Sequence, residues 1–148
     1  MSRPREFHTH SADQTIAVGR LLSTLLNPGE MVILRGDLGV GKTTFVKGLA
    51  EAFGAALQDD VTSPTFTLVH EYRGPEVTLF HIDLYRIDTE RELATLGIAD
   101  LRTEPGSILL IEWGEKFEQL VTESDGEISI ERTGESDRTI SFCPRGKG

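Results

Sequence analysis

The chain has 148 residues, of which 38% are hydrophobic and 26% are charged. These values are typical of one folded domain; they exclude a disordered chain and leave no room for a second independent core. No apolar run approaches the roughly 18 residues that a membrane-spanning helix needs. No secretory signal is readable at the N-terminus, and the one cysteine cannot form an intramolecular disulfide. We therefore expect a cytoplasmic protein that does not contact a membrane.

The net charge of the chain limits the kinds of molecule that it can bind directly. Fifteen Lys and Arg residues stand against 24 Asp and Glu residues, which gives a net charge of −9. Direct binding of nucleic acid depends on cationic groups that neutralise phosphates, and a negative field repels a polyanion. We do not expect free-standing binding of DNA or RNA, unless a local basic patch or a partner protein provides the contact.

The first predicted elements are a short strand over residues 6–10 and a helix behind it. Ser11 begins a Ser-x-x-Gln pattern, which is typical of a capping box, and apolar side chains follow at helical spacing until residues 27–29 (Asn-Pro-Gly). Residues 31–34 are apolar, as in a buried strand. A glycine-rich loop over residues 36–41 then leads into a second amphipathic helix.

Strands dominate the predicted second half. It contains strands 66–72 and 77–83 around a hairpin turn, a helix over 89–96, an apolar strand over 108–111, and a final antiparallel pair, 128–131 and 139–142. Strands that alternate first with helices and then with hairpins indicate an α/β fold. We expect a mixed sheet of the P-loop NTPase type, parallel at its centre with antiparallel hairpins at its margins, flanked by helices.

The strongest motif lies between the second predicted strand and the second helix. Residues 36–43 read Gly-Asp-Leu-Gly-Val-Gly-Lys-Thr, a complete Walker A pattern in its proper context. Glycines allow the backbone N–H groups to turn inward as an anion-binding nest, and the following helix directs its positive end at the phosphates. In such a loop Lys42 reaches the β- and γ-phosphates and the Thr43 hydroxyl binds Mg²⁺.

A phosphate loop also needs an acidic residue at the end of a neighbouring strand. Glu112 follows the apolar strand 108–111, as in a Walker B element with Glu in place of Asp, and Asp83 ends a less regular strand. Spacing alone does not rank the two, and either could be the polar residue at a strand exit. Thr65 follows the second helix, where a switch threonine senses the γ-phosphate, although Ser-Pro-Thr also begins ordinary turns.

Other polar residues have ordinary interpretations. His81 alternates with apolar neighbours and is expected to be a plain strand position, not a base. For the arginines, including Arg138, exposure to solvent is the default, although each could contact phosphate or a partner. The chain has no Asn-Lys-x-Asp motif, so nothing supports guanine-specific recognition.

Four segments, in this order and spacing, together resemble the TsaE family, also called YjeE. They are residues 36–44, 63–68, 81–86 and 111–113. The family consists of small bacterial ATPases required for the threonylcarbamoyladenosine (t6A37) modification of tRNA. The resemblance covers nearly the whole chain, and it alone, not the composition, suggests a role in tRNA modification.

The resemblance implies a role for individual residues. Those that it makes catalytic are Lys42, Thr65, Asp83 and Glu112. It makes Thr43 and Glu112 the Mg²⁺ ligands. The nucleotide-binding residues that it implies are Ser11, Thr15, Asp37, Leu38, Gly39, Val40, Gly41, Lys42, Thr43, Thr44 and Arg138. Members of the family often carry alanine where this chain has Val40.

The resemblance also implies how the protein works. It indicates a single P-loop ATPase domain over residues 1–148 that uses ATP and Mg²⁺, associates with the TsaB and TsaD proteins and resets that complex between turnovers. tRNA is then contacted mainly through these partners, and turnover of the chain alone is slow, because no arginine finger is identifiable. Two alternatives stay open: a small-molecule kinase on the same loop, and a non-catalytic module whose docking is gated by nucleotide.

Overall fold

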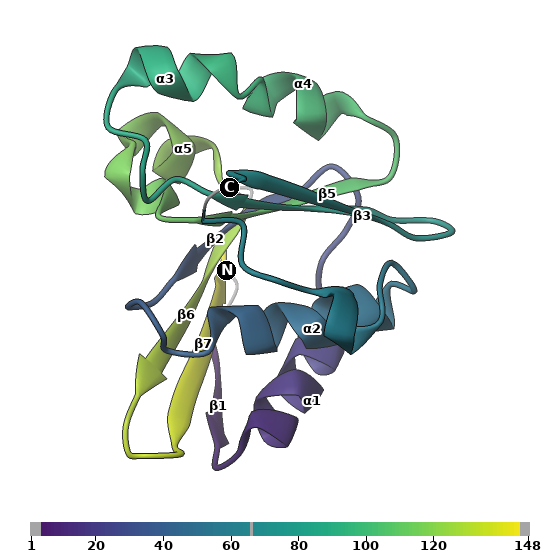
Figure 1. Cartoon of the computed structure of the whole chain (residues 1–148), viewed down its shortest axis with the longest axis vertical. Helices are drawn as coiled ribbons and strands as arrows, with labels where there is room; N and C mark the ends of the chain where they lie inside the picture. Colours follow the sequence, from purple (N-terminus) through teal and green to yellow (C-terminus); the bar gives the residue numbers. More distant parts are fainter. Residues whose placement is uncertain (1–3, 66, 146–148) are drawn as a thin grey trace.

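The computed structural model describes residues 4–65 and 67–145, in which seven strands form one sheet in the order β1-β7-β6-β2-β5-β4-β3 (Figure 1). The strands are β1 (Arg5–Thr9), β2 (Met31–Arg35), β3 (Val69–Arg73), β4 (Thr78–Asp83), β5 (Ser107–Glu112), β6 (Gly126–Arg132) and β7 (Arg138–Pro144). The helices are α1 (Ala12–Ser23), α2 (Lys42–Ala52), α3 (Glu90–Thr95), α4 (Ile98–Thr103) and α5 (Glu118–Glu123). In the ranges that the structure describes, no helix is long and apolar enough to cross a membrane.

The sheet is parallel at its centre and antiparallel at both margins, as predicted. Strands β6, β2, β5 and β4 run parallel. The antiparallel neighbours are β7 and β1 beyond β6, and β3 beyond β4. Parallel strands are covered on both faces, so they form nearly continuous apolar runs, and every residue of β5 is buried. The carboxyl ends of β2, β4 and β5 therefore meet at one edge of the sheet, which is where ligands bind in open α/β sheets.

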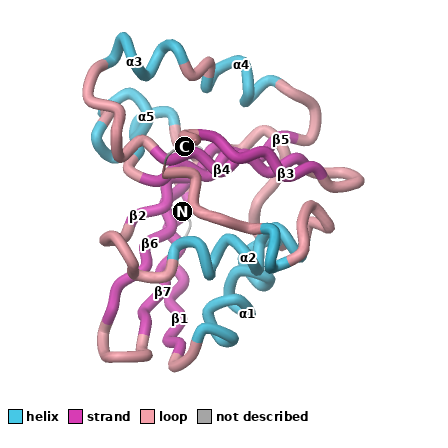
Figure 2. The backbone as a smooth tube through the Cα atoms, in the orientation of Figure 1, coloured by secondary structure: helices cyan, strands magenta, loops and turns pink. Residues whose placement is uncertain are grey.

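The two faces of the sheet carry separate groups of helices (Figure 2). Side chains of β5 alternate between them: Ile108 and Leu110 join the core under α1 and α2, whereas Leu109 and Ile111 join the core that includes α3 and α5 side chains. The alternation is the period of two that a strand imposes. Glu112, at the end of β5, consequently points to the face that carries α2.

Helices α1 and α2 cross at very short range. A Cβ atom placed on Gly48 of α2 would lie 2.0 Å from the carbonyl oxygen of Ile16 in α1. Only glycine allows two backbones to approach so closely without displacement. The crossing sets the position of the N-terminus of α1 relative to the N-terminus of α2.

The structure differs from the sequence prediction in three places. The strand predicted from residue 66 begins at Val69; residue 66 lies outside the described residues, and Leu68 has a φ of 70° that interrupts extended backbone. Helices α4 and α5 were not predicted. Gly97, in the left-handed conformation, ends α3 and also begins α4, while α5 buries only Leu120 and so shows no apolar periodicity.

Candidate functional site

The glycine-rich loop leaves the carboxyl end of β2 and leads directly into α2. Gly39 and Gly41 have φ angles of 75° and 111°, in the left-handed region that glycine adopts at little cost. Gly41 caps α2 without any side-chain hydrogen bond, so the first N–H groups of the helix are not satisfied by a capping side chain. A turn of this shape followed by a helix N-terminus fits a phosphate group.

Lys42 is buried at the start of α2, with only 6% of its surface exposed. Its Nζ donates to the carbonyl oxygen of Gly36 at 2.7 Å and lies 3.2 Å from Oε1 of Glu112. The same ammonium group lies 4.9 Å from the ring centroid of Trp113, a distance at which a cation and an indole attract each other. The loop lysine is thus held inside the site by a carbonyl, a carboxylate and an aromatic ring.

Asp83 and Glu112, the two acids that the sequence did not rank, lie on neighbouring strands. They are register partners of β4 and β5, and both are buried. Asp83 accepts a hydrogen bond from the Thr65 hydroxyl at 2.9 Å and another from the backbone N–H of Tyr85 at 2.8 Å. The two acids therefore have different contacts. Glu112 faces the loop lysine, whereas Asp83 is hydrogen-bonded to the segment that carries Thr65.

A cavity of about 370 Å³ joins the loop to these acids. Its lining residues are Leu38, Gly39, Gly41, Lys42, Thr43, Thr44, Ser63, Thr65, Asp83 and Glu112. The Ser63 and Thr65 hydroxyls lie 2.8 Å apart at its wall. Thr65 was open to two interpretations, switch residue or ordinary turn, and the structure places it in this cavity against Asp83. Asp37 is not among the lining residues; it lines a separate hollow with Arg35 and Ser129.

His81 has a role that its sequence context did not indicate. The residue is fully buried in β4, and its Nε2 is hydrogen-bonded to Oε2 of Glu112. An ionised carboxylate can only accept, so Nε2 carries the proton and donates it. The prediction of a plain strand position for His81 was therefore incomplete. The register of β4 against β5 reveals this contact, and a single sequence does not supply it.

The surroundings of Glu112 act on its charge in opposite directions. Burial raises the pKa of this carboxyl, but the hydrogen bond and electrostatic interaction with His81 and the nearby Lys42 ammonium group lower it, and the net pKa is below the usual value for glutamate. Glu112 is thus an ionised carboxylate at neutral pH. Together with the Thr43 hydroxyl in the same cavity, it offers oxygen donors of the kind that Mg²⁺ accepts beside phosphate oxygens.

A second cavity, of about 380 Å³, continues from the first and shares Gly41 and Thr44 with it. Its other lining residues are His10, Ser11, Ala12, Thr15, Val40, Glu135, Ser136 and Arg138. They come from the start of α1, the glycine-rich loop and the turn between β6 and β7. The two cavities together have room for one ligand that has a phosphate end and a second, bulkier part.

Local hydrogen bonds fix the walls of this second cavity. Ser11 caps α1, since its hydroxyl accepts from the N–H of Gln14 at 3.1 Å, as the sequence predicted. Thr15 is hydrogen-bonded to Thr9 at 2.9 Å. On the opposite wall, Arg138 Nε donates to the carbonyl oxygen of Val40 at 2.7 Å and so ties the β6–β7 hairpin to the loop. Ser11, Thr15 and Arg138, distant in sequence, line one pocket.

Comparisons with known proteins show the family to which the chain belongs. The family model described as "Threonylcarbamoyl adenosine biosynthesis protein TsaE" matches residues 9–140. The chain belongs to the TsaE family. The tRNA threonylcarbamoyladenosine biosynthesis protein TsaE of Bacillus subtilis is 36% identical over 141 residues, which cover 95% of this chain and 86% of that protein. TsaE of Treponema pallidum is 37% identical over 135 residues, which cover 91% and 97%.

A solved structure shows the same fold. The crystal structure of YdiB from Bacillus subtilis superposes with a TM-score of 0.76 at 32% sequence identity, and covers 99% of this chain and 88% of that one. The mixed sheet with its parallel centre and flanking helices is a P-loop NTPase fold. The family and the fold that the four sequence segments indicated are both confirmed.

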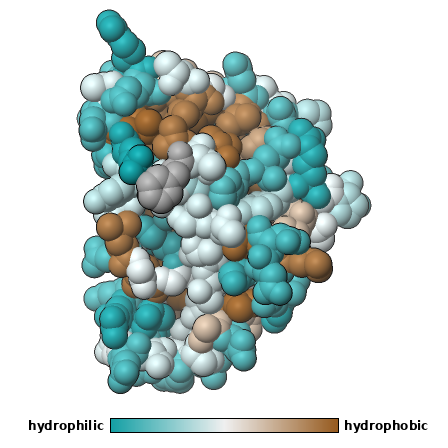
Figure 3. Space-filling model, viewed as in Figure 1, coloured by the Kyte–Doolittle hydropathy of each residue, from teal (hydrophilic) through white to brown (hydrophobic). Residues whose placement is uncertain are grey.

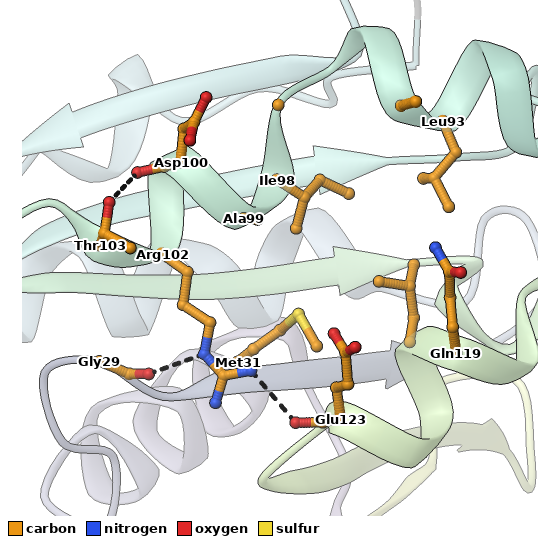
Figure 4. A pocket seen from close by; sticks show the side chains of 13 residues that line it. Gly29, Met31, Leu93, Ile98, Ala99, Asp100, Arg102, Thr103, Gln119 and Glu123 are labelled. Carbon is orange, nitrogen blue, oxygen red and sulfur yellow. Dashed lines mark hydrogen bonds between the residues drawn. The ribbon is translucent and has the colours of Figure 1, made fainter.

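A further hollow in this TsaE-family chain lies away from the glycine-rich loop (Figure 4). It measures about 670 Å³ and is lined from α3, α4, α5 and the beginning of β2, the end opposite the loop. Arg102 spans it, with hydrogen bonds to the carbonyl oxygens of Gly29 at 3.1 Å and Glu123 at 3.2 Å. Figure 3 shows apolar surface below α3 and α4. Arg102 also pairs with Asp125 at 2.6 Å, so its guanidinium group already has partners within the fold.

Proposed function

We propose that this chain is an ATP-binding, Mg²⁺-dependent ATPase, a single domain over residues 1–148 that takes part in t6A37 biosynthesis in tRNA. The pairing of Lys42 with Glu112 at the mouth of a glycine-rich loop carries the proposal. A buried lysine at the start of a helix, facing an ionised acid on the next strand, is the arrangement that phosphoryl transfer requires. Membership of the TsaE family supplies the biological context.

The two joined cavities support ATP as the ligand. The phosphates would lie on the loop, where the N–H groups of α2 and the Lys42 ammonium group are directed. The adenosine would occupy the second cavity between Ser11 and Thr15 on one side and Arg138 on the other. The sequence lacks the Asn-Lys-x-Asp motif of guanine-specific sites, so we assign adenine and not guanine.

The residues of the chain would divide the work of hydrolysis. Lys42 and the loop N–H groups stabilise the charge that spreads over the γ-phosphate oxygens as water attacks phosphorus and the bond to ADP breaks. Asp83, Glu112 and Thr65 line the wall where that water would be oriented. Thr43 and Glu112 would hold Mg²⁺, which when bound neutralises charge on the β- and γ-phosphates.

The proposed partners are TsaB and TsaD. A chain with a net charge of −9 is poorly suited to grip tRNA by itself, so tRNA would be contacted mainly through these proteins, with ATP binding and hydrolysis resetting their complex. We propose slow hydrolysis by the isolated chain and stimulation by the partners. The setting that we propose for this work is the cytoplasm.

The large hollow does not favour a small-molecule kinase. The acceptor of a kinase must meet the γ-phosphate, whereas this hollow opens at the opposite end of β2 from the loop. A test of both ideas is to supply ATP with candidate metabolites and to measure free phosphate against phosphorylated product. Release of free phosphate alone supports the ATPase assignment. Formation of a phosphorylated metabolite would instead identify the chain as a kinase.

The decisive variant is Lys42→Ala, with Lys47→Ala on the same helix as its matched control. Lys42 is in the site and Lys47 does not line either cavity. We expect Lys42→Ala to abolish measurable phosphate release and Lys47→Ala to leave it unchanged. Equal rates for Lys42→Ala and the wild type would make the ATPase assignment wrong. Purification with TsaB and TsaD in the presence and absence of ATP tests the partners separately.

A further inference from the structure

A buried imidazole lies directly behind the acid of the loop site. His81 is fully buried, two residues before Asp83 on β4, and its side chain shares with Asp83 the face of the sheet that carries α2. β4 pairs with β5 so that His81 is opposite Leu110 and diagonal to Glu112. This diagonal allows the ring to reach the far side of the Glu112 carboxylate.

The two oxygens of Glu112 have different partners. Oε1 faces the Lys42 ammonium group at 3.2 Å, and Oε2 accepts the hydrogen bond from His81 Nε2. In the proposed function Lys42 serves the phosphates of the nucleotide, which takes it away from Oε1. His81 has no such second use, since it is fully enclosed. One oxygen of the carboxylate thus has a partner that can leave and the other has a partner that stays.

Packing alone does not explain a histidine here. Every residue of β4 is buried, and the other nitrogen of the ring, Nδ1, has no hydrogen-bond partner among the described residues. A polar group buried without a partner destabilises the fold, so an apolar residue would serve a purely structural position better. The contact with Glu112 is the interaction that this ring makes and an apolar side chain could not.

We propose that His81 is a positioning residue: it holds Glu112 by Oε2 so that Oε1 is directed at the Mg²⁺ that accompanies ATP. The inference rests on the proposed ATPase function and adds to it a residue outside the cavity. Hydrogen-bonded partners of metal-ligating side chains typically change metal affinity by about 10- to 100-fold when they are removed. His81 should therefore affect the use of Mg²⁺ more than the binding of the nucleotide itself.

The test compares two amides of similar polarity. In His81→Gln the terminal N–H₂ can take the place of Nε2, whereas the shorter side chain of His81→Asn ends near the position of Nδ1 and does not reach Glu112. Trp113, the one tryptophan in the sequence, adjoins Lys42 and reports nucleotide binding by its fluorescence. ATP affinity is measured in excess Mg²⁺ and in EDTA for the wild type and both variants, and the ratio of the two affinities is the readout.

We expect His81→Asn to lower this ratio about 10-fold or more with affinity in EDTA unchanged, and His81→Gln to restore most of it. Unchanged ratios in both variants would overturn the inference. So would an equal loss of affinity in Mg²⁺ and in EDTA, because that pattern indicates a structural role. If the wild type binds no ATP under either condition, the proposed function itself fails, and the inference fails with it.

Discussion

Asp83 and Glu112 are register partners on the adjacent parallel strands β4 and β5, so their carboxylates leave the sheet side by side at the edge where β2 enters the glycine-rich loop. Both acids are buried, but their side chains contact different partners. Lys42 and His81 contact Glu112, whereas Thr65 and the N–H of Tyr85 contact Asp83. This division gives each acid a distinct expected phenotype.

Replacing Asp83 by Asn should reduce hydrolysis and spare binding. A group that orients or accepts a proton from the attacking water contributes about 100-fold or more to the rate, so kcat for phosphate release should fall by that order. ATP affinity in Mg²⁺ should change little, because Asp83 does not contact Lys42 in the structure. Asp59→Asn, at an exposed position on the connection after α2, is the control. A wild-type kcat in Asp83→Asn would remove Asp83 from the mechanism.

The hydroxyl of Thr65 should matter more than that of Ser63, although the two are hydrogen-bonded to each other. Thr65 reaches Asp83 directly, so Thr65→Ala removes a contact to a buried carboxylate, while Thr65→Ser keeps it. The loss of one such hydrogen bond in the reacting state corresponds to about a 10-fold lower kcat. Single-turnover hydrolysis by Thr65→Ala, Thr65→Ser and Ser63→Ala measures this. If all three variants hydrolyse ATP at the wild-type rate, the segment is an ordinary turn.

Much of the site could be predicted because its main motif is contiguous. Lys42 and Thr43 belong to an eight-residue pattern whose chemistry depends on spacing along the chain, and the apolar run before Glu112 marked a strand end. The pairing of Glu112 with Asp83 depends on the register of two strands 29 positions apart in sequence, which no local pattern encodes. The contact of His81 with Glu112 depends on the same register, so the local pattern around His81 predicts only an ordinary strand position.

The unpredicted part of the fold has a related cause. Helices α4 and α5 have six residues each, too few for an apolar period to repeat. Gly97 correctly predicts the end of α3, but the same residue is also the N-cap of α4. A glycine that is expected to end a helix gives no indication that a second helix begins there. The residues from the β6–β7 turn that line the second cavity, Glu135 and Ser136, carry no motif and meet α1 only through the sheet order β1-β7-β6.

The lowered pKa of Glu112 predicts how stability depends on pH. At acidic pH the unfolded chain binds more protons at this site than the folded chain does. The ionised carboxylate therefore stabilises the fold fully above the ordinary glutamate pKa of about 4.3, and the contribution is lost as pH falls through the lower folded value. The difference in free energy of unfolding between the wild type and Glu112→Gln should shrink on acidification.

Urea unfolding of both proteins between about pH 7 and pH 3 measures that difference, over a range that spans the ordinary glutamate pKa. Glu118→Gln, on an exposed position of α5, controls for the loss of one negative charge. A difference between the wild type and Glu112→Gln that grows as pH falls would contradict the ion pair that the structure shows.

A larger side chain in the second cavity should weaken binding of ATP without weakening binding of inorganic tripolyphosphate. Ala12 lines that cavity at the start of α1, and Ala12→Leu adds three carbons where the adenosine would lie. We expect ATP affinity to fall about 10-fold, the effect of roughly 1.4 kcal/mol, while inorganic tripolyphosphate binds as before. Ala17→Leu, exposed on the same helix, should change neither. Equal weakening of both ligands by Ala12→Leu would place the adenosine elsewhere.

The crossing of α1 and α2 makes the site sensitive to one buried methyl group. A Cβ on Gly48 would lie 2.0 Å from the carbonyl oxygen of Ile16, so Gly48→Ala must separate the helices that carry Ser11 and Lys42. Overpacking of this kind costs about 3 kcal/mol, which for a chain of this size lowers Tm by roughly 6 to 12 °C. Lys47→Ala, one position earlier on α2, should change stability by no more than about 0.5 kcal/mol. Thermal unfolding of the two variants compares them directly.

Saturating MgATP should restore part of the Tm lost in Gly48→Ala, because a ligand that binds only the folded state stabilises it. If Gly48→Ala has the Tm of the wild type in the absence of ATP, the helices can separate at no cost in stability.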